Sequence, residues 1–213
     1  MIFEVDAVLF DIDGTLVDST PVVERTWRTW GAAHGYDAEE ILRVCHGRRT
    51  ADTVAMFIPP DGRAAAVAEL EALERADFDG VVALPGAAAL LDRLAPHRWA
   101  AVTSGPRALM RARLAAAGLP APDVLVAAED VTAGKPDPEG YRKAAAALGF
   151  DARRCLVVED APAGLAAGRA AGAATVAVAT SHALAELNAD AAIPDLTPLT
   201  VTVTERGVVV TVR

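Results

Sequence analysis

Two aspartates separated by one residue lie near the start of the chain, in the run Asp11-Ile12-Asp13-Gly14-Thr15. A carboxylate can attack phosphorus and form an acyl phosphate, and a second carboxylate nearby can deliver and remove the protons that this reaction needs. The spacing therefore predicts Asp11 as a nucleophile and Asp13 as a general acid and base. Alone the pair is weak evidence, because Asp-Gly is also a common turn dipeptide.

Other polar side chains follow short apolar runs further along the chain. Thr103 and Ser104 come directly after one such run, although they could instead cap the next helix. Glu159 and Asp160 come after another. Lys135 lies in Gly134-Lys135-Pro136 and is one of only two lysines in a chain that otherwise uses arginine, which favours a specific role for it.

Carboxylates gathered in one crevice repel one another, so this set predicts a bound cation. Oxygen ligands without nearby His or Cys favour Mg²⁺. We expect the ligands to be Asp11, the backbone carbonyl of Asp13, and Asp160. Glu159 is expected to orient these groups rather than bind the metal itself. The remaining polar residues would hold a phosphate, namely Thr103, Ser104 and Lys135.

Alternating apolar runs and helical patterns must position these residues. The apolar runs are short and predict buried parallel strands; they cover 5–10, 99–102, 124–128, 155–158 and 175–179. Helical spacing of apolar residues lies between them, for example Ala87, Leu90, Leu91 and Leu94. This order predicts an α/β fold with a doubly wound parallel sheet, in which ligands bind beyond the carboxyl ends of the strands.

Residues 18–84 interrupt this alternation. Val23, Trp27 and Trp30 share a helical face, and no convincing strand is found in the segment. We therefore expect a small helical cap domain over 18–84, and an α/β core domain over 1–17 and 85–213. The tail over 199–212 alternates Val and Thr and predicts a terminal hairpin with a turn near Gly207.

Composition narrows the classes of partner. The formal net charge is −9, which disfavours nucleic acid, while 53% hydrophobic residues are enough for a sizeable core. No apolar segment reaches membrane-spanning length, and no basic leader precedes one, so we expect no membrane partner and a cytoplasmic location. Cys45 and Cys155 give neither a disulfide framework nor a zinc spacing. We expect a monomer, although the tail hairpin could pack on the core or on a second copy.

Four motifs in this order resemble those of the haloacid dehalogenase superfamily of phosphatases. They are Asp11-Ile12-Asp13-Gly14-Thr15-Leu16-Val17, Thr103-Ser104-Gly105, Gly134-Lys135-Pro136, and Glu159-Asp160-Ala161-Pro162-Ala163-Gly164. The resemblance covers the whole chain and implies a Rossmann-like core with a helical cap, an aspartyl-phosphate intermediate and Mg²⁺. Asp13 favours phosphate chemistry, because a dehalogenase proper lacks the second aspartate.

The cap sequence resembles that of the sugar- and polyol-phosphate phosphatases, which act on compounds such as 2-deoxyglucose 6-phosphate or glycerol phosphate. The resemblance rests on Cys45-His46-Gly47-Arg48-Arg49-Thr50, on Arg25-Thr26-Trp27-Arg28-Thr29-Trp30 and on Leu84-Pro85-Gly86. It implies that His46 and Arg49 face the substrate hydroxyls, although an ordinary structural role for His46 is nearly as well supported.

Two alternatives remain. β-Phosphoglucomutase-like enzymes share the core and cap type, but they carry an arginine three residues after the cap glycine and a lysine in the cap. Here Thr50 takes that position and the insert has no lysine. A silent phosphate-binding or regulatory module is the other alternative, and it would be expected to lack one of the charged groups, all of which are present.

Overall fold

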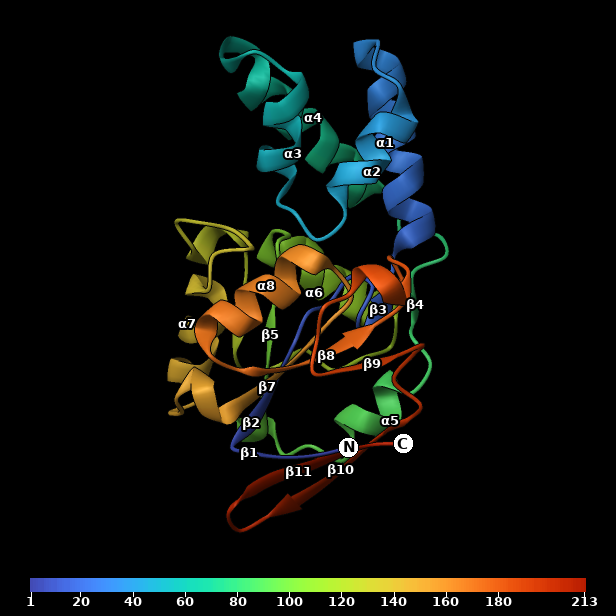
Figure 1. Ribbon diagram of the computed structural model, residues 1–213. Helices are drawn as coiled ribbons and strands as arrows, with labels where there is room; N and C mark the ends of the chain where they lie inside the picture. The colour runs from blue at the N-terminus through green and yellow to red at the C-terminus, as the bar shows by residue number, and fades with distance from the viewer.

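The computed structural model describes residues 1–213 as an α/β core with a separate helical lobe above it (Figure 1). The central sheet has the strand order β6-β5-β2-β7-β8-β9, and every neighbouring pair is parallel. Its strands are β2 (Ala7–Phe10), β5 (Trp99–Val102), β6 (Leu125–Val126), β7 (Cys155–Glu159), β8 (Ala174–Val178) and β9 (Ala191–Ile193). The predicted doubly wound α/β fold is confirmed, although β9 was not predicted.

Helices cover both faces of this sheet. Because side chains alternate along a strand, Val8 and Phe10 pack into one apolar cluster with α5 (Ala87–Leu91) and α6 (Arg107–Ala116). Ala7 and Leu9 point to the opposite face. There they meet the buried side chains of α7 (Glu139–Ala147) and α8 (Pro162–Ala171). The sheet is therefore buried on both sides, as its continuous apolar strands predict.

Four helices form the lobe, and the side chains between them make an apolar cluster of their own that includes Trp27, Trp30 and Leu70. The helices are α1 (Thr20–His34), α2 (Ala38–Cys45), α3 (Thr50–Phe57) and α4 (Arg63–Ala76). The lobe sits above the carboxyl ends of the central strands (Figure 1). Inserted helices therefore form a cap over the edge of the sheet that carries the predicted motifs.

A two-stranded ribbon connects the lobe to the core. β3 (Val17–Asp18) pairs antiparallel with β4 (Val82–Ala83). The prediction that the segment over 18–84 contains no strand is therefore wrong at Asp18 and at Val82–Ala83. Strands of two residues are too short to show the alternation from which a strand is predicted. The predicted domain boundaries, after residues 17 and 84, lie within or next to this ribbon and stay a prediction.

A second sheet lies at the opposite end of the core. β10 (Leu199–Thr204) and β11 (Gly207–Val212) form the predicted hairpin, and β1 (Ile2–Val5) pairs with β11. The expected single strand over residues 5–10 is corrected here, because the chain passes from one sheet to the other at Asp6, whose carboxylate pairs with Arg154. Val201, Val208 and Val210 belong to the main core cluster, so the hairpin packs on the core.

The remaining elements are short 3₁₀ turns: η1 (Pro60–Gly62), η2 (Pro96–Arg98), η3 (Ala128–Asp130), η4 (Ala152–Arg154) and η5 (Leu184–Glu186). No helix combines the length and the apolar character that crossing a membrane would require.

Candidate active site

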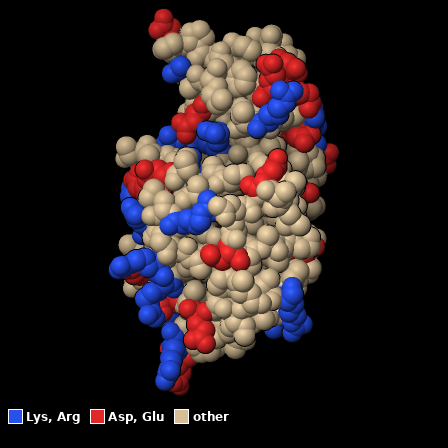
Figure 2. Space-filling view, in the orientation of Figure 1, with Lys and Arg blue, Asp and Glu red and all other residues tan.

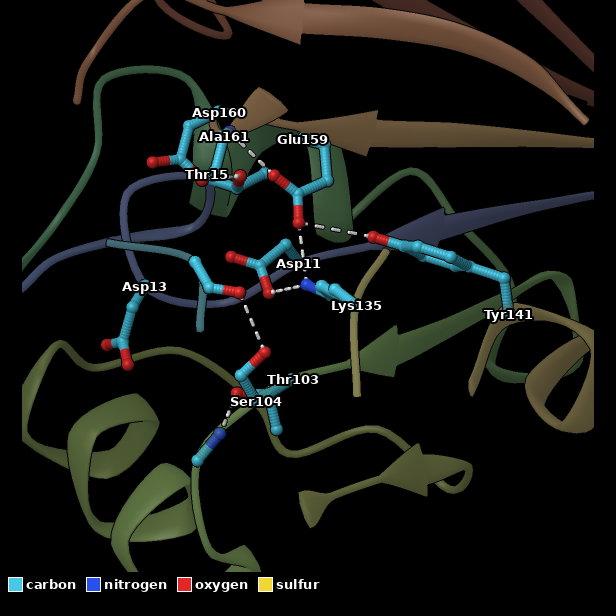
Figure 3. Close-up of polar contacts among 12 residues, drawn as sticks. Asp11, Asp13, Thr15, Thr103, Ser104, Lys135, Tyr141, Glu159, Asp160 and Ala161 are labelled. Atoms are coloured by element: carbon cyan, nitrogen blue, oxygen red, sulfur yellow. Dashed lines mark hydrogen bonds and ion pairs between the residues drawn. The ribbon is translucent and has the colours of Figure 1, made fainter. Parts of the chain in front are cut away.

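The predicted polar residues lie together at the carboxyl ends of neighbouring strands (Figure 3). Asp11 follows β2, Thr103 follows β5, and Glu159 is the last residue of β7. Since β2 lies between β5 and β7 in the sheet, these three chain segments end side by side. The crevice at the carboxyl edge of a parallel sheet is the usual place for a ligand.

Lys135 is the centre of the charged network. Its Nζ lies 2.6 Å from Asp11 Oδ1 and 2.6 Å from Glu159 Oε1, and its side chain is only 5% exposed. Although burial lowers the pKa of Lys135, the carboxylates of Asp11 and Glu159 raise it further, and it lies well above its usual value. Lys135 therefore stays charged at neutral pH and fixes the position of one oxygen of Asp11.

Three buried carboxylates face this single ammonium group. Oxygens of Asp11, Glu159 and Asp160 all lie within 4.8 Å of one another. Burial raises the pKa of Asp11 to about 7, against the opposing effect of Lys135. Burial raises the pKa of Asp160 well above its usual value, and the charges of Glu159 and Asp11 add to the effect. This excess of negative charge, supplied by oxygen donors alone, fits a divalent metal ion.

Two glycines make room for these carboxylates. Gly14 has a φ of +82°, and a Cβ atom there would lie 2.2 Å from Asp160 Oδ2. At Gly164, near the start of α8, a Cβ atom would lie 1.7 Å from Glu159 Oε1. Any side chain at either position would displace a charged group of the site. Steric contact with the carboxylates therefore explains why the first and fourth motifs have glycine at these positions.

Both oxygens of Glu159 are engaged within the protein. Oε1 accepts hydrogen bonds from Lys135 and, at 3.4 Å, from the Tyr141 hydroxyl, while Oε2 accepts one from the Ala161 N–H at 2.7 Å (Figure 3). A carboxylate with both oxygens occupied is better suited to orienting its neighbours than to binding a metal.

The second aspartate of the first motif points toward the lobe and pairs with an arginine. Arg113 Nη1, from α6, lies 2.5 Å from Asp13 Oδ2, and Arg113 Nη2 lies 3.3 Å from Glu74 Oε1 of α4. Neither partner was predicted, although a signal exists. Arg113 comes one turn after Met110, and Glu74 one turn after Leu70, so each places a charge on a buried helical face.

A cavity that is partly open to solvent lies between the lobe and the core. Figure 2 shows the boundary between the lobe and the core, with basic and acidic side chains on both sides of it. The core lines the cavity with Asp11, Asp13, Thr103, Ser104 and Asp160, and the lobe lines it with Trp27, His46, Arg48 and Glu74. Ser181, which the sequence did not single out, also lines it and donates a hydrogen bond to the Asp160 carbonyl.

The hydroxyls of the second motif do not cap a helix. Thr103 Oγ1 accepts a hydrogen bond from the Gly105 N–H at 3.1 Å, and Ser104 Oγ donates one to the Gly47 carbonyl at 2.9 Å. The helix that follows has Pro106 at its N-cap position. The alternative interpretation of these residues as caps is therefore wrong, and Ser104 instead ties the core to the loop of the lobe.

The two loop residues expected to face substrate lie differently. His46 lines the cavity, its ring centroid 6.4 Å from that of His182, and burial lowers its pKa. Arg49 pairs with Asp52 at 2.7 Å and donates to the Thr132 carbonyl, outside the cavity. Arg48 lines this cavity instead, whereas Arg49 lines a neighbouring pocket with Lys135, so the expected contact of Arg49 with substrate hydroxyls stays a prediction. Direction within a short loop depends on packing that the sequence pattern does not encode.

Comparison with known proteins decides the family. The family model described as haloacid dehalogenase-like hydrolase matches residues 5–172. The chain belongs to this family. It is 45% identical over 208 residues to hexitol phosphatase A of Escherichia coli strain K12, covering 95% of this chain and 96% of that protein.

Two further relatives share most of the chain. Glycerol-1-phosphate phosphohydrolase 2 of Saccharomyces cerevisiae is 37% identical over 193 residues, covering 85% of this chain and 77% of that protein. Among solved structures, CbbY from Rhodobacter sphaeroides in complex with phosphate aligns with a TM-score of 0.75 and 25% identity, covering 90% of this chain and 95% of that one. The relatives that share most of this sequence thus include proteins named hexitol phosphatase A and glycerol-1-phosphate phosphohydrolase 2.

Proposed function

We propose that this haloacid dehalogenase-like hydrolase is a Mg²⁺-dependent phosphatase that acts on a small sugar or polyol phosphate through an aspartyl-phosphate intermediate. The observation that carries the proposal is the set of contacts that the Asp11 carboxylate makes. Its carboxylate lines the cavity, and Lys135 binds only one of its two oxygens, Oδ1. The other oxygen is left to attack phosphorus.

The two aspartates divide the reaction between them. Asp11 forms a bond to phosphorus as the bond to the leaving oxygen breaks, and Asp13 gives that oxygen a proton. Water then attacks the phosphorus of the aspartyl-phosphate, Asp13 takes the water's proton, and phosphate leaves with Asp11 restored. Asp13 Oδ1 has no hydrogen-bond partner in the structure, which supports its role in proton transfer.

The metal and phosphate contacts follow from the same residues. Asp11, the backbone carbonyl of Asp13, and Asp160 would hold Mg²⁺, which would supply charge compensation for the transferred phosphoryl group. Lys135, Thr103 and Ser104 would bind the phosphate oxygens. Most of the rate acceleration would then come from positioning and charge compensation.

The helical lobe over 18–84 would act as a cap on the core domain over 1–17 and 85–213, excluding water and contacting the leaving group. His46 and Arg48 line the cavity on its lobe side and can meet hydroxyl groups there. The names of hexitol phosphatase A and glycerol-1-phosphate phosphohydrolase 2 support a polyhydroxylated leaving group.

We also propose that the protein acts as a cytoplasmic monomer. The tail sheet packs its apolar face on the core of the same molecule, which supports a monomer. Both cysteines are free and buried, which suits a reducing compartment.

A substrate screen tests the proposed activity. Phosphate release with Mg²⁺ should be fastest from hexitol, hexose or glycerol phosphates, and β-glucose 1-phosphate should not be isomerised. His46→Ala should lower kcat/KM for the best of these substrates, with exposed His97→Ala as the matched control. Isomerisation faster than release would favour the mutase, and no release from any of these compounds would exclude the proposed function.

Removal of a metal ligand should change stability in a metal-dependent way. In EDTA at pH 7.5 we expect Asp160→Asn to unfold at a higher temperature than the wild type. The folded state raises the pKa of Asp160, so its ionised form destabilises the fold above that pKa, and the cost disappears as the pH falls toward 3.8. Each kcal/mol gained corresponds to about 2–4 °C in a chain of this size.

The same unfolding experiment tests the metal site. Mg²⁺ should raise the melting temperature of the wild type, and it should raise that of Asp160→Asn much less. The control is Asp123→Asn, which makes the same charge change at an exposed position. An equal response of all three proteins to Mg²⁺ would remove Asp160 from the metal site.

A further inference from the structure

A buried polar chain leads from the reaction centre into the helical lobe. Asp13 pairs with Arg113, and Arg113 pairs with Glu74, at 2.5 Å and 3.3 Å. Arg113 is 2% exposed and Glu74 is 7% exposed. All three residues line the cavity between lobe and core. These ion pairs therefore join a core helix to a cap helix at the wall of the cavity.

Each of these three ion-paired residues has a polar side-chain atom without a hydrogen-bond partner. Five buried side-chain atoms in the whole protein lack a hydrogen bond, and three of them are Asp13 Oδ1, Arg113 Nε and Glu74 Oε2. The other two belong to Thr53 and Arg98, which do not line this cavity. Buried polar atoms are nearly always paired in native proteins. Asp13 Oδ1 already has the proposed role in proton transfer. Arg113 Nε and Glu74 Oε2, which belong to two residues that line the same cavity, are therefore the atoms that a further ligand group would satisfy.

The chemistry of these atoms selects the ligand. A carboxylate oxygen accepts hydrogen bonds and a guanidinium N–H donates them, whereas an alcohol hydroxyl does both. A second phosphate would meet the negative charges of Glu74 and Asp13. An alkyl group would leave the polar atoms unsatisfied, at the cost that such burial carries. A neutral hydroxyl is the group that suits both neighbours.

We propose that Glu74 and Arg113 form a subsite for a hydroxyl of the leaving alcohol, with Glu74 Oε2 accepting a hydrogen bond from it and Arg113 Nε donating one to its oxygen. This subsite rests on the proposed phosphatase function and names the residues that distinguish a polyol phosphate from a plain alkyl phosphate. Because Glu74 belongs to the lobe and Arg113 to the core, the subsite is complete only where the two parts meet.

A purely structural ion pair is the competing explanation, since the same contacts also join the lobe to the core. The two explanations differ in their dependence on substrate. A structural pair would affect all phosphate esters alike, because it would change only how the cap packs. A hydroxyl subsite affects only those substrates that carry the hydroxyl.

The test compares matched phosphate esters in the Glu74→Gln variant. Glycerol 1-phosphate and sorbitol 6-phosphate are paired with propyl phosphate and hexyl phosphate, which have the same carbon number and no free hydroxyl. For the hydroxylated esters we expect kcat/KM to fall by about 10-fold or more, mainly through KM, because a charged acceptor is replaced by a neutral one. For the alkyl esters we expect a change of no more than about 2-fold, since they carry no hydroxyl that could bind Glu74.

The control is Glu71→Gln, one turn earlier on α4, where the glutamate pairs with Arg75 and does not line the cavity. It should leave all four rates unchanged. Melting temperatures of both variants verify the fold, and in Glu74→Gln the amide oxygen of the new side chain can still accept a hydrogen bond from Arg113.

The outcomes separate the two proposals. An equal loss on hydroxylated and alkyl esters in Glu74→Gln, or no loss on either, would overturn the subsite. Equal turnover of both kinds of ester by the wild type would also overturn it, while leaving a phosphatase. Failure of the wild type to release phosphate from these four esters and from the hexose phosphates of the screen would overturn the proposed function itself.

Discussion

Replacement of Asp11 by Asn should abolish phosphate release while the fold survives. The amide cannot act as the nucleophile, so the aspartyl-phosphate cannot form, and we expect the rate to fall by roughly 10,000-fold or more, the scale found when a covalent nucleophile is removed. Asn has nearly the same shape as Asp, and Lys135 keeps its ion pair with Glu159. The measurement is phosphate release with Mg²⁺ from the best substrate of the screen, together with thermal unfolding.

Asp6→Asn provides the matched control for this variant. Asp6 precedes β2 as Asp11 follows it, and it is also largely buried and ion-paired, with Arg154. It lies at the opposite end of the strand, so its replacement should leave kcat unchanged even if the melting temperature falls. Full activity in Asp11→Asn would exclude the aspartyl-phosphate route.

Much of the site could be predicted because parallel sheets impose a simple geometry. Once residues 5–10, 99–102 and 155–158 were interpreted as strands of one sheet, the side chains after them had to meet at one edge. Asp11, Thr103 and Glu159 do lie there, close to Lys135. Short continuous apolar runs are sufficient for this inference, because a strand that is buried on both faces carries apolar side chains at every position.

The parts that escaped prediction depend on contacts between distant segments. Arg113 and Glu74 are 39 positions apart and meet only because the lobe folds over the core. The strands β3 and β4 are too short to show an apolar pattern. That Arg48 rather than Arg49 lines the cavity depends on the path of one loop. Charges on buried helical faces were visible in the sequence, but their partner could not be identified there.

Replacement of Lys135 by Met should remove activity and destabilise the fold together. The ammonium pairs with Asp11 and Glu159 inside the protein, and its loss leaves buried carboxylates without a counter-charge. Breaking a buried pair in this way costs about 3–5 kcal/mol. Activity should fall by at least about 1,000-fold, because the phosphate also loses its positive contact. Phosphate release and thermal unfolding with and without Mg²⁺ measure the two effects.

The pH dependence of this variant gives a second test. Burial already raises the pKa of Asp11 to about 7 and raises the pKa of Asp160 well above its usual value, and loss of Lys135 removes an opposing charge from both. The folded variant therefore binds protons more tightly than the unfolded chain, so its metal-free stability should rise as the pH falls from 8 toward 5. Mg²⁺ at neutral pH should restore part of the stability but not the activity. Lys143→Met, which removes the exposed lysine paired with Glu139, should change neither property. Equal behaviour of the two lysine variants would show that Lys135 is not the counter-charge of the site.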